Sequence, residues 1–449
     1  MSDVLKKYMS RNVPRYTSYP TAPQFSDAVN AEKYAQSLAA LDPDEPISLY
    51  LHVPFCRQLC WYCGCNMKLA TRDAPIAQYA KTLMQDVSLL ADHLPARMKI
   101  SHLHWGGGTP TALVPDDLER VMELVCRRFD VLPDAELAIE SDPRTLTSEM
   151  TQRIGQLGFT RASFGVQEFD AKVQAAINRV QPPDMVRRSV DGLRDVGVSG
   201  INFDLIYGLP HQSVETLLET VRLCAEMRPD RVALFGYAHV PWVAKKQRLI
   251  DEEALPGPSE RLAQANAAAS SLRASGYIAL GLDHFALPND TLARAAAAGK
   301  LRRNFQGYTD DQAQTMLGVG ATSIGRTPSS YFQNIAETGA WARAVEAGTL
   351  PVGKGCLLSE EDRLRGHVIE ELMCQGRVDL NEAAVRHGFV KDWYADILPS
   401  LVEMQRDGLI TLDRTVLSVT EVGKPVVRVI ASVFDAYLSP ATARHAIAV

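Results

Sequence analysis

The sequence predicts an α/β protein built around a partial barrel of parallel strands, and two observations carry this prediction. Short β-rich runs alternate with amphipathic helical segments about six times between residues 46 and 240. Such alternation is typical of repeated β-α-β units, whose strands run parallel. Beyond residue 240 the pattern is too irregular for eight repeats, so we expect a (β/α)6 arrangement related to the closed eight-stranded barrel.

Each predicted strand is a run of β-branched and aliphatic residues that ends at a turn signal. The strands are expected at Ile47–Val53, Ile100–Trp105, Leu137–Glu140, Arg161–Val166, Ile201–Ile206 and Arg231–Tyr237. Apolar residues spaced three and four apart predict helices between them, at residues 74–95, 116–129 and 214–227. Catalytic groups of such folds lie at the carboxyl ends of the strands, so the site is expected in the loops that follow them.

The two ends of the chain differ from this pattern. Residues 1–42 have few periodic elements and are expected to form an N-terminal arm, with residues 43–345 forming the barrel and its extension. Residues 346–449 are expected to form a mainly helical domain similar to a winged helix, with helices at residues 360–374, 380–387 and 393–406 and a hairpin at 409–419. Because this region is not strongly basic, a lid or packing role is expected rather than DNA binding.

Composition narrows the class of protein. The chain has 449 residues, of which 46% are hydrophobic and 22% charged, which excludes a disordered, collagen-like or coiled-coil chain. Its 47 basic and 53 acidic residues give a net charge of −6, which argues against nucleic acid as a partner. Neither an apolar run of membrane-spanning length nor a signal-peptide core is present, so the cytoplasm is the expected location and no membrane the expected partner.

Four of the eight cysteines fall within ten residues. Cys56, Cys60 and Cys63 have the spacing C-x3-C-x2-C, which can hold three irons of a cubane iron–sulfur cluster and leave the fourth iron open to a ligand. With Cys65 as a fourth ligand, the same cysteines could instead bind zinc, although structural zinc sites usually consist of two separated pairs. Unliganded thiols are the third alternative.

Polar residues and glycines at the ends of the other strands are candidates for a binding site. Gly106-Gly107-Gly108-Thr109 lets the backbone approach a ligand closely, although a plain tight turn explains three glycines equally well. Glu140 ends a strand at the same rim and is either a ligand for ribose or amine groups or a surface acid. Asp204 lies between Phe203 and Leu205 in an apolar strand, where a carboxyl group needs a partner.

The cysteine spacing, with an aromatic residue before the third cysteine, resembles the signature of the radical S-adenosylmethionine superfamily. The wider set of motifs resembles the oxygen-independent coproporphyrinogen III oxidases, also called dehydrogenases, within it. These motifs extend from residue 15 to beyond residue 324. They are Arg15–Pro20, Tyr50–Asn66, Trp105–Thr111, Asp204–Pro210 and Asn304–Tyr308.

The resemblance implies a radical SAM oxidoreductase of heme (porphyrin) biosynthesis that binds a [4Fe-4S] cluster and two S-adenosylmethionine molecules. A 5′-deoxyadenosyl radical would take hydrogen from two propionates of coproporphyrinogen III in turn, each would lose carbon dioxide and become a vinyl group, and protoporphyrinogen IX would result. An electron donor such as a flavodoxin-type protein and an electron acceptor would be partners, and the enzyme would be a monomer.

Site residues carry over from the resemblance position by position. Cys56, Cys60 and Cys63 would bind the cluster, Cys65 is not assigned as a ligand, and no catalytic side chain is named beyond the cluster and cofactor contacts. The first S-adenosylmethionine would contact Tyr50, Gly107 and Glu140. The second would contact Tyr62, Gly108, Thr109, Gln167, Arg179, Asp204, Ala238 and Ile324. The candidates for binding the substrate carboxylates are Arg15, Arg302 and Arg303.

Three competing functions stay open at this point. A heme chaperone shares the barrel but generally lacks the Cys63-Gly64-Cys65-Asn66 extension and the Arg15–Pro20 arm, both of which are present here. A radical enzyme that modifies heme would consume heme and give a different tetrapyrrole. A zinc-bound regulator that uses the winged-helix-like tail would contain zinc and no iron.

Overall fold

The computed structural model describes residues 3–9, 11–390 and 393–438, which form two compact units. The barrel unit comprises residues 26–275 and 313–357. The tail unit comprises residues 1–25, 276–312 and 358–449. The division of the chain into an arm, a barrel and a tail at residues 42 and 345 stays a prediction.

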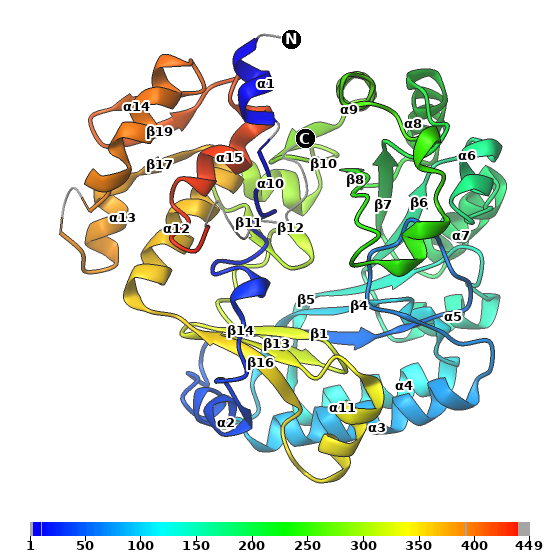
Figure 1. Ribbon diagram of the computed structural model, residues 1–449. Helices are drawn as coiled ribbons and strands as arrows, with labels where there is room; N and C mark the ends of the chain where they lie inside the picture. The colour runs from blue at the N-terminus through cyan, green and yellow to red at the C-terminus, as the bar shows by residue number, and fades with distance from the viewer. Residues whose placement is uncertain (1–2, 10, 391–392, 439–449) are drawn as a thin grey trace. The chain divides into compact units, whose positions relative to one another are not determined.

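The barrel unit contains six parallel strands that follow one another in chain order, as the sequence predicts (Figure 1). Each strand pairs with the next in parallel register, as in Leu51 opposite Trp105 and Asp204 opposite Ala233. The mixed α/β fold with a partial (β/α)6 barrel is therefore confirmed. The six strands are β1 (Ile47–Val53), β4 (Lys99–Gly107), β5 (Asp130–Ser141), β6 (Arg161–Gln167), β7 (Gly200–Tyr207) and β8 (Arg231–Gly236).

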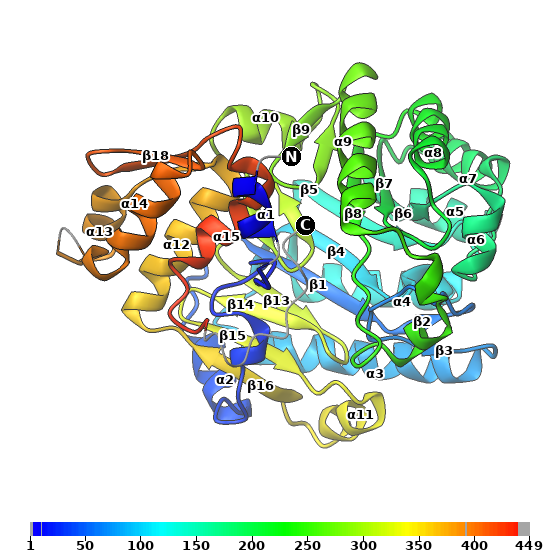
Figure 2. The same cartoon turned by 45° about the horizontal axis from the view of Figure 1, so that its top comes forward.

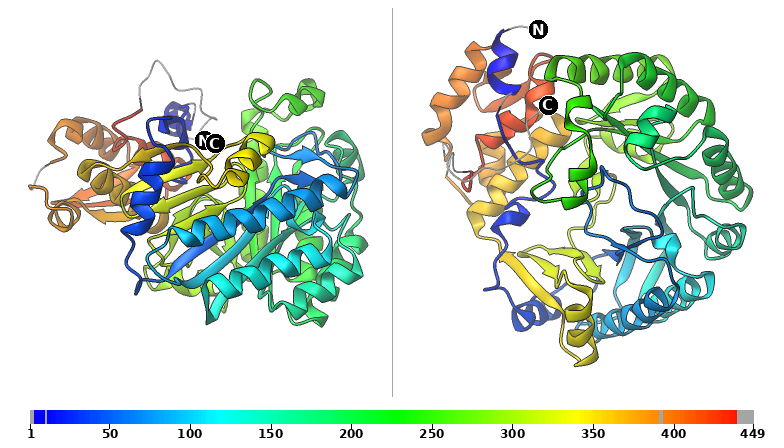
Figure 3. Two further views of the ribbon diagram at one scale, coloured as in Figure 1. Left: turned by 90° about the horizontal axis from the view of Figure 1, so that it is seen from below. Right: turned by 45° about the vertical axis from the view of Figure 1, so that its right-hand side comes forward.

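Helices pack side by side along the outer face of these strands, each next to the following one (Figures 2 and 3). Their apolar stripes are buried; in α8, for example, Leu217, Val221 and Cys224 are fully enclosed. Ser213 begins α8 with a capping box, because its hydroxyl accepts from the Thr216 amide and Thr216 bonds back. The layer consists of α3 (Ala74–Asp92), α4 (Pro115–Arg128), α5 (Ser148–Gln156), α7 (Pro183–Asp195), α8 (Val214–Met227) and α9 (Pro258–Ala274), with the short α6 (Ala171–Ala176) after β6.

The sheet of the barrel unit continues past β1 on its other edge. There β13 (Met316–Val319) runs parallel to β1, and three antiparallel strands follow. The ring of Tyr34 packs against Phe332 at 4.3 Å between centroids and so attaches a helix to this extension. The remaining elements are β14 (Ile324–Thr327), β15 (Ser330–Asn334), β16 (Val352–Leu357), α11 (Thr338–Glu346) and α2 (Ala31–Ala39).

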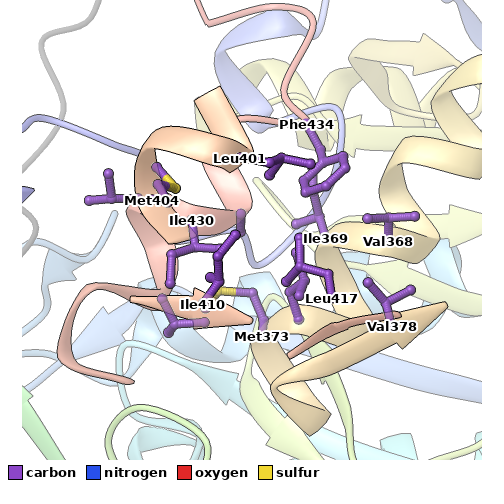
Figure 4. Packing of buried hydrophobic residues seen from close by; sticks show 14 of the residues in the cluster. Val368, Ile369, Met373, Val378, Leu401, Met404, Ile410, Leu417, Ile430 and Phe434 are labelled. Carbon is purple, nitrogen blue, oxygen red and sulfur yellow. The ribbon is translucent and has the colours of Figure 1, made fainter. Parts of the chain in front are cut away.

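The tail unit buries a separate apolar cluster in which Ile369, Met373, Leu401 and Phe434 meet (Figure 4). The first helix of its C-terminal segment, residues 358–449, is capped by Ser359, whose hydroxyl accepts from the Asp362 amide. The three helices and the hairpin expected in this segment are present, although the third helix begins at Leu398 rather than at residue 393, and a further short helix follows. They are α12 (Glu360–Gln375), α13 (Leu380–Arg386), α14 (Leu398–Arg406), α15 (Val427–Ser432), and a sheet in the order β17 (Arg377–Asp379), β19 (Val416–Val419), β18 (Ile410–Asp413).

The N-terminal segment is more ordered than the sequence indicates. It contains α1 (Asp3–Met9), and Tyr8, Val13, Tyr16 and Tyr19 are buried in the cluster of the tail unit. The expectation of few regular elements before residue 42 is therefore wrong, because α2 also falls there. Short hairpins complete the unit, formed by β9 (Ile278–Leu280) with β10 (His284–Ala286) and by β11 (Arg302–Asn304) with β12 (Gly307–Thr309), with α10 (Thr291–Ala297) between them.

In the part of the chain that the structure describes, every helix is too short or too polar to span a lipid bilayer.

Candidate active site

The cysteine loop leaves the carboxyl end of β1 and is closed by a short parallel bridge. Phe55–Cys56 (β2) pairs with Lys68–Leu69 (β3), and the amide of Ala70 donates to the Cys56 carbonyl at 2.9 Å. The two ends of the loop are thus hydrogen-bonded to each other, and Cys56, Cys60 and Cys63 all lie within this closed loop. Closing a loop this short restricts the positions its side chains can take.

Contacts from other elements fix the middle of the cysteine loop. The Trp61 amide donates to the Ile177 carbonyl at 3.0 Å, and the Asn178 side chain donates to the Leu59 carbonyl at 2.7 Å. On the far side, the Gln247 amide group donates to the Tyr62 carbonyl at 2.7 Å. The loop is therefore held by segments that follow β6 and β8, at the rim where the carboxyl ends of the parallel strands meet.

The surroundings favour the thiolate form at one thiol of the loop, Cys63, whereas burial raises the pKa of Cys56. Cys60 is buried, Cys56 and Cys63 are partly buried, and none of the described cysteines is in a disulfide. A hydrogen bond from the Cys65 thiol, with help from Lys246, holds the pKa of Cys63 below its ordinary value. In the described residues, no three His, Cys, Asp or Glu side chains converge as ligands of one metal ion would. A cubane cluster does not require such convergence, because each thiolate binds a different iron.

Two guanidinium groups lie against the sulfur of Cys60. Arg144 Nη2 donates to Cys60 Sγ at 3.2 Å, and Arg179 Nη1 donates to the same atom at 3.3 Å. Asp142 lies between the two arginines and accepts from both. Burial alone would raise the pKa of Asp142, but Arg179 and Arg144 outweigh burial and hold the pKa below its usual range.

The glycine segment at the end of β4 lies directly against the start of the cysteine loop. Gly107 has φ +119°, a conformation that L side chains rarely adopt. A Cβ atom at Gly108 would lie 2.7 Å from the Phe55 carbonyl oxygen, so only glycine lets the two backbones approach. Thr109 Oγ1 lies 3.5 Å from Cys56 Sγ and connects the two segments.

Tyr50, Gly107 and Glu140, which the resemblance assigns to the first S-adenosylmethionine, lie together in the structure. Glu140 Oε2 accepts from the Gly107 amide at 3.1 Å, and Glu140 Oε1 lies 3.3 Å from His104 Nε2. The rings of Tyr50 and His104 are stacked, with centroids 5.9 Å apart. The group therefore joins side chains of β1, β4 and β5 with a backbone amide, an arrangement suited to an amino-acid headgroup.

The second predicted set gathers around β6 and β7. Gly165 and Asp204 are opposite each other in the two strands, and Arg179 Nε donates to the Gly165 carbonyl at 2.9 Å. Burial, with the negative charge of Glu140 second, raises the pKa of Asp204 to about 7. Gln167 is buried with φ +67°, and its Oε1 has no hydrogen-bond partner among the described residues. A buried acceptor without a partner is suited to a ligand donor.

The last predicted residues reach the site through the backbone. The Ala238 carbonyl accepts from Gln247 at 3.1 Å, and Gln247 also bonds the Tyr62 carbonyl. Ile324 lies at the start of β14, where a Cβ on Gly318 would lie 2.9 Å from the Ile324 carbonyl oxygen. Gly318 in turn is opposite Tyr50 in β1. The carry-over from the resemblance thus selects residues that are neighbours at one rim.

Sequence reasoning missed the side chains that surround the ligands. Asp142 and Arg144 follow β5 in Ser141-Asp142-Pro143-Arg144, and Lys246 and Gln247 lie in a short turn (Lys245–Leu249) after β8. Arg144 could have been predicted as a site residue, because it follows the carboxyl end of a strand, where functional groups of such folds lie. Nothing in the pattern around Gln247 indicates that it contacts the cysteine loop.

The parallel barrel and the three-cysteine loop beside a glycine-rich strand end define a radical SAM enzyme. In agreement, the profile of the radical SAM superfamily matches residues 50–224. Among relatives, the "Oxygen-independent coproporphyrinogen III oxidase" of Bradyrhizobium diazoefficiens is 46% identical over 448 residues and covers 100% of both chains. A protein of the same name from Cereibacter sphaeroides is 45% identical over 431 residues, which is 95% of each chain.

Among solved structures, coproporphyrinogen III oxidase from Escherichia coli, described as a radical SAM enzyme, superposes with a TM-score of 0.91 at 36% identity. The match covers 95% of this chain and 100% of that one. The chain belongs to the oxygen-independent coproporphyrinogen III oxidase family. It is therefore a radical SAM oxidoreductase of porphyrin biosynthesis, with an iron–sulfur cluster and S-adenosylmethionine as its cofactors.

Proposed function

We propose that this chain decarboxylates two propionate side chains of coproporphyrinogen III to vinyl groups without oxygen and so yields protoporphyrinogen IX. The full-length similarity to relatives that bear the name of this activity carries the proposal. The assembled rim supports it, because the residues expected to bind the cofactors are neighbours there.

Cys56, Cys60 and Cys63 would hold three irons of the [4Fe-4S] cluster. The three thiols lie in one loop, which is closed by the pairing of β2 with β3. When bound, the cluster and S-adenosylmethionine supply a one-electron reductant and an organic radical that takes hydrogen from carbon.

Tyr50, Gly107 and Glu140 would bind the first of two S-adenosylmethionine molecules. Glu140 is already oriented by the Gly107 amide, so its second oxygen is held toward His104 and the rim. Asp204 and the unpaired oxygen of Gln167 would bind polar groups of the second molecule. The contacts of that molecule would also include Tyr62, Gly108, Thr109, Arg179, Ala238 and Ile324.

The substrate carries four carboxylates and needs cationic partners. Arg302 Nε already donates to Glu370 at 2.8 Å, which occupies part of that guanidinium group. Arg303 is buried over the ring of Tyr308 at 4.4 Å, and its Nε and Nη1 have no partner among the described residues. Arg303 is therefore the better of these two candidates, with Arg15 as the third.

The reaction also requires partners and a suitable compartment. We propose a flavodoxin-type protein as the electron donor, a separate electron acceptor, a monomeric enzyme and a cytoplasmic location. Cys65 is proposed to be no cluster ligand, so a Cys65→Ala protein should keep its full iron and sulfide content.

An anaerobic turnover assay tests the proposed function. The reconstituted protein is incubated with coproporphyrinogen III, S-adenosylmethionine and a reductant. The product is then oxidised, and its mass is measured by mass spectrometry. Loss of two carboxyl groups is expected. Cys56→Ala should abolish it, whereas Cys126→Ala, at an exposed cysteine on α4, should not. Cleavage of S-adenosylmethionine without change of the substrate would contradict the proposal, and heme would then be the next ligand to test.

A further inference from the structure

We propose that Arg144, which no motif assigned, sets the reduction potential of the iron–sulfur cluster through its hydrogen bond to the ligand sulfur of Cys60. The inference rests on the proposed binding of a cluster by Cys56, Cys60 and Cys63. It makes Arg144 a positioning residue, since it acts on the cluster through Cys60.

The guanidinium group of Arg144 is held in one orientation. Its Nη2 donates to Asp142 Oδ2 at 2.6 Å, its Nε donates to Asp142 Oδ1 at 3.0 Å, and its backbone amide donates to the same Oδ1 at 3.0 Å. The side chain is only 4% exposed. Such a forked pair fixes the plane of the guanidinium, so the direction of its contact with Cys60 Sγ does not depend on a flexible side chain.

The charges around Cys60 add up to a net positive value. Arg144 and Arg179 contribute two positive charges, and Asp142, 9% exposed, contributes one negative charge that faces both. The other two thiols have weaker neighbours among the described residues. Cys56 Sγ lies 3.5 Å from the Thr109 hydroxyl. Cys63 Sγ accepts from the Cys65 amide at 3.4 Å and has a single cationic neighbour, Lys246. Cys60 is therefore the ligand position where the protein places two buried guanidinium donors.

Reduction adds one negative charge to the cluster and its sulfur ligands. Hydrogen bonds and positive charge at a ligand sulfur stabilise the reduced form more than the oxidised form, so they raise the potential. The effect is strong in a buried site, where water screens little. Removing the Arg144 guanidinium should therefore make the cluster harder to reduce. Removing the negative charge of Asp142 should make it easier to reduce.

The test is a redox titration of the reconstituted protein, followed by the EPR signal of the reduced cluster, with no substrate present. In Arg144→Gln the ratio of reduced to oxidised cluster at a fixed potential should fall about tenfold, which corresponds to a shift of about 59 mV to more negative values. In Asp142→Asn the potential should shift the other way. Arg153→Gln is the control, because Arg153 pairs with Asp116 and Glu119 on α4 and lies outside the cysteine loop's contacts.

Opposite shifts in Arg144→Gln and Asp142→Asn support the proposal. An unchanged potential in Arg144→Gln with full iron and sulfide overturns it. If Arg144→Gln does not assemble a cluster, the redox titration is carried out on Arg144→Lys and Asp142→Asn instead. A reduction potential in Asp142→Asn that is equal to or lower than that of the original protein then overturns the proposal. Because the titration contains no coproporphyrinogen III, its result is independent of whether the substrate assignment is correct.

Discussion

Glu140 accepts a hydrogen bond from the backbone amide of Gly107 at 3.1 Å, across the neighbouring strands β5 and β4. The bond joins the residue expected to bind the amine or ribose of S-adenosylmethionine to the glycine segment that contacts the cysteine loop. A ligand bound by one would therefore be positioned by the other.

Glu140→Gln should weaken binding of S-adenosylmethionine by about tenfold, because a charge-assisted hydrogen bond is exchanged for a neutral one worth about 1–2 kcal/mol less. Equilibrium dialysis with the reconstituted protein measures the affinity, and iron content should stay unchanged. Glu149→Gln, at an exposed position of α5, is the matched control. Equal affinity in the Glu140 variant and the original protein would remove Glu140 from the first binding site.

Gly108→Ala should disturb the cysteine loop. Its Cβ would lie 2.7 Å from the Phe55 carbonyl oxygen and 2.9 Å from the Phe55 amide nitrogen, and backbone cannot yield as a side-chain tip can. We expect a loss of about 1–3 kcal/mol in stability, typical of overpacking, together with reduced iron incorporation. Gly257→Ala is the control, because open space surrounds that Cβ and φ is −71°. Full iron content in Gly108→Ala would mean that the segment adjusts without cost.

The fold was predictable where its signals are local. β1 and α8 have the bounds that the hydrophobic pattern predicts, Ile47–Val53 and Val214–Met227. The parallel partner β13 could not be found in this way. Its four residues include a glycine and carry little pattern, and its pairing of Ser48 with Met316 joins distant parts of the chain.

The same contrast holds for the candidate site. The cysteine spacing identified the cluster loop, and the family resemblance supplied the cofactor contacts. Arg302–Asn304 and Gly307–Thr309 form a hairpin, because pairing rather than propensity orders them. The cationic neighbours of Cys60 come from Arg144 after β5 and Arg179 after β6, and only the folded sheet brings these two together.

Asp86 should make stability depend on pH. It is buried in α3, and its Oδ2 accepts from the Gly320 amide at 2.8 Å and from Trp341 Nε1 at 3.0 Å. Burial raises its pKa from 3.8 to about 6. The folded protein therefore binds more protons than the unfolded chain between these two values. Stability contributed by this group is present near pH 4 and is lost as the pH rises through 6.

The measurement is thermal unfolding under anaerobic conditions at pH 4.5 and 7, compared with Asp86→Asn. The asparagine oxygen can accept both hydrogen bonds but does not titrate. The original protein should lose on the order of 2 kcal/mol more free energy of unfolding than the variant over this interval, because a tenfold change in proton affinity corresponds to about 1.4 kcal/mol. Asp191→Asn, at an exposed position of α7, should leave the pH dependence unchanged. Parallel pH profiles of the original protein and Asp86→Asn would show that Asp86 is not the titrating group.

Tyr16→Ala should destabilise the tail unit. Tyr16 is 4% exposed within the cluster that contains Ile369 and Phe434, and its hydroxyl donates to Asp435 at 3.0 Å. Removing the ring leaves a cavity, and such changes cost about 3–5 kcal/mol for a large aromatic residue. Tyr16→Phe keeps the ring and loses only the hydrogen bond, at about 1 kcal/mol. Limited proteolysis and thermal unfolding should rank the proteins as original, Tyr16→Phe, Tyr16→Ala. If Tyr16→Ala is as resistant as the original protein, the N-terminal segment does not contribute to the stability of the tail unit.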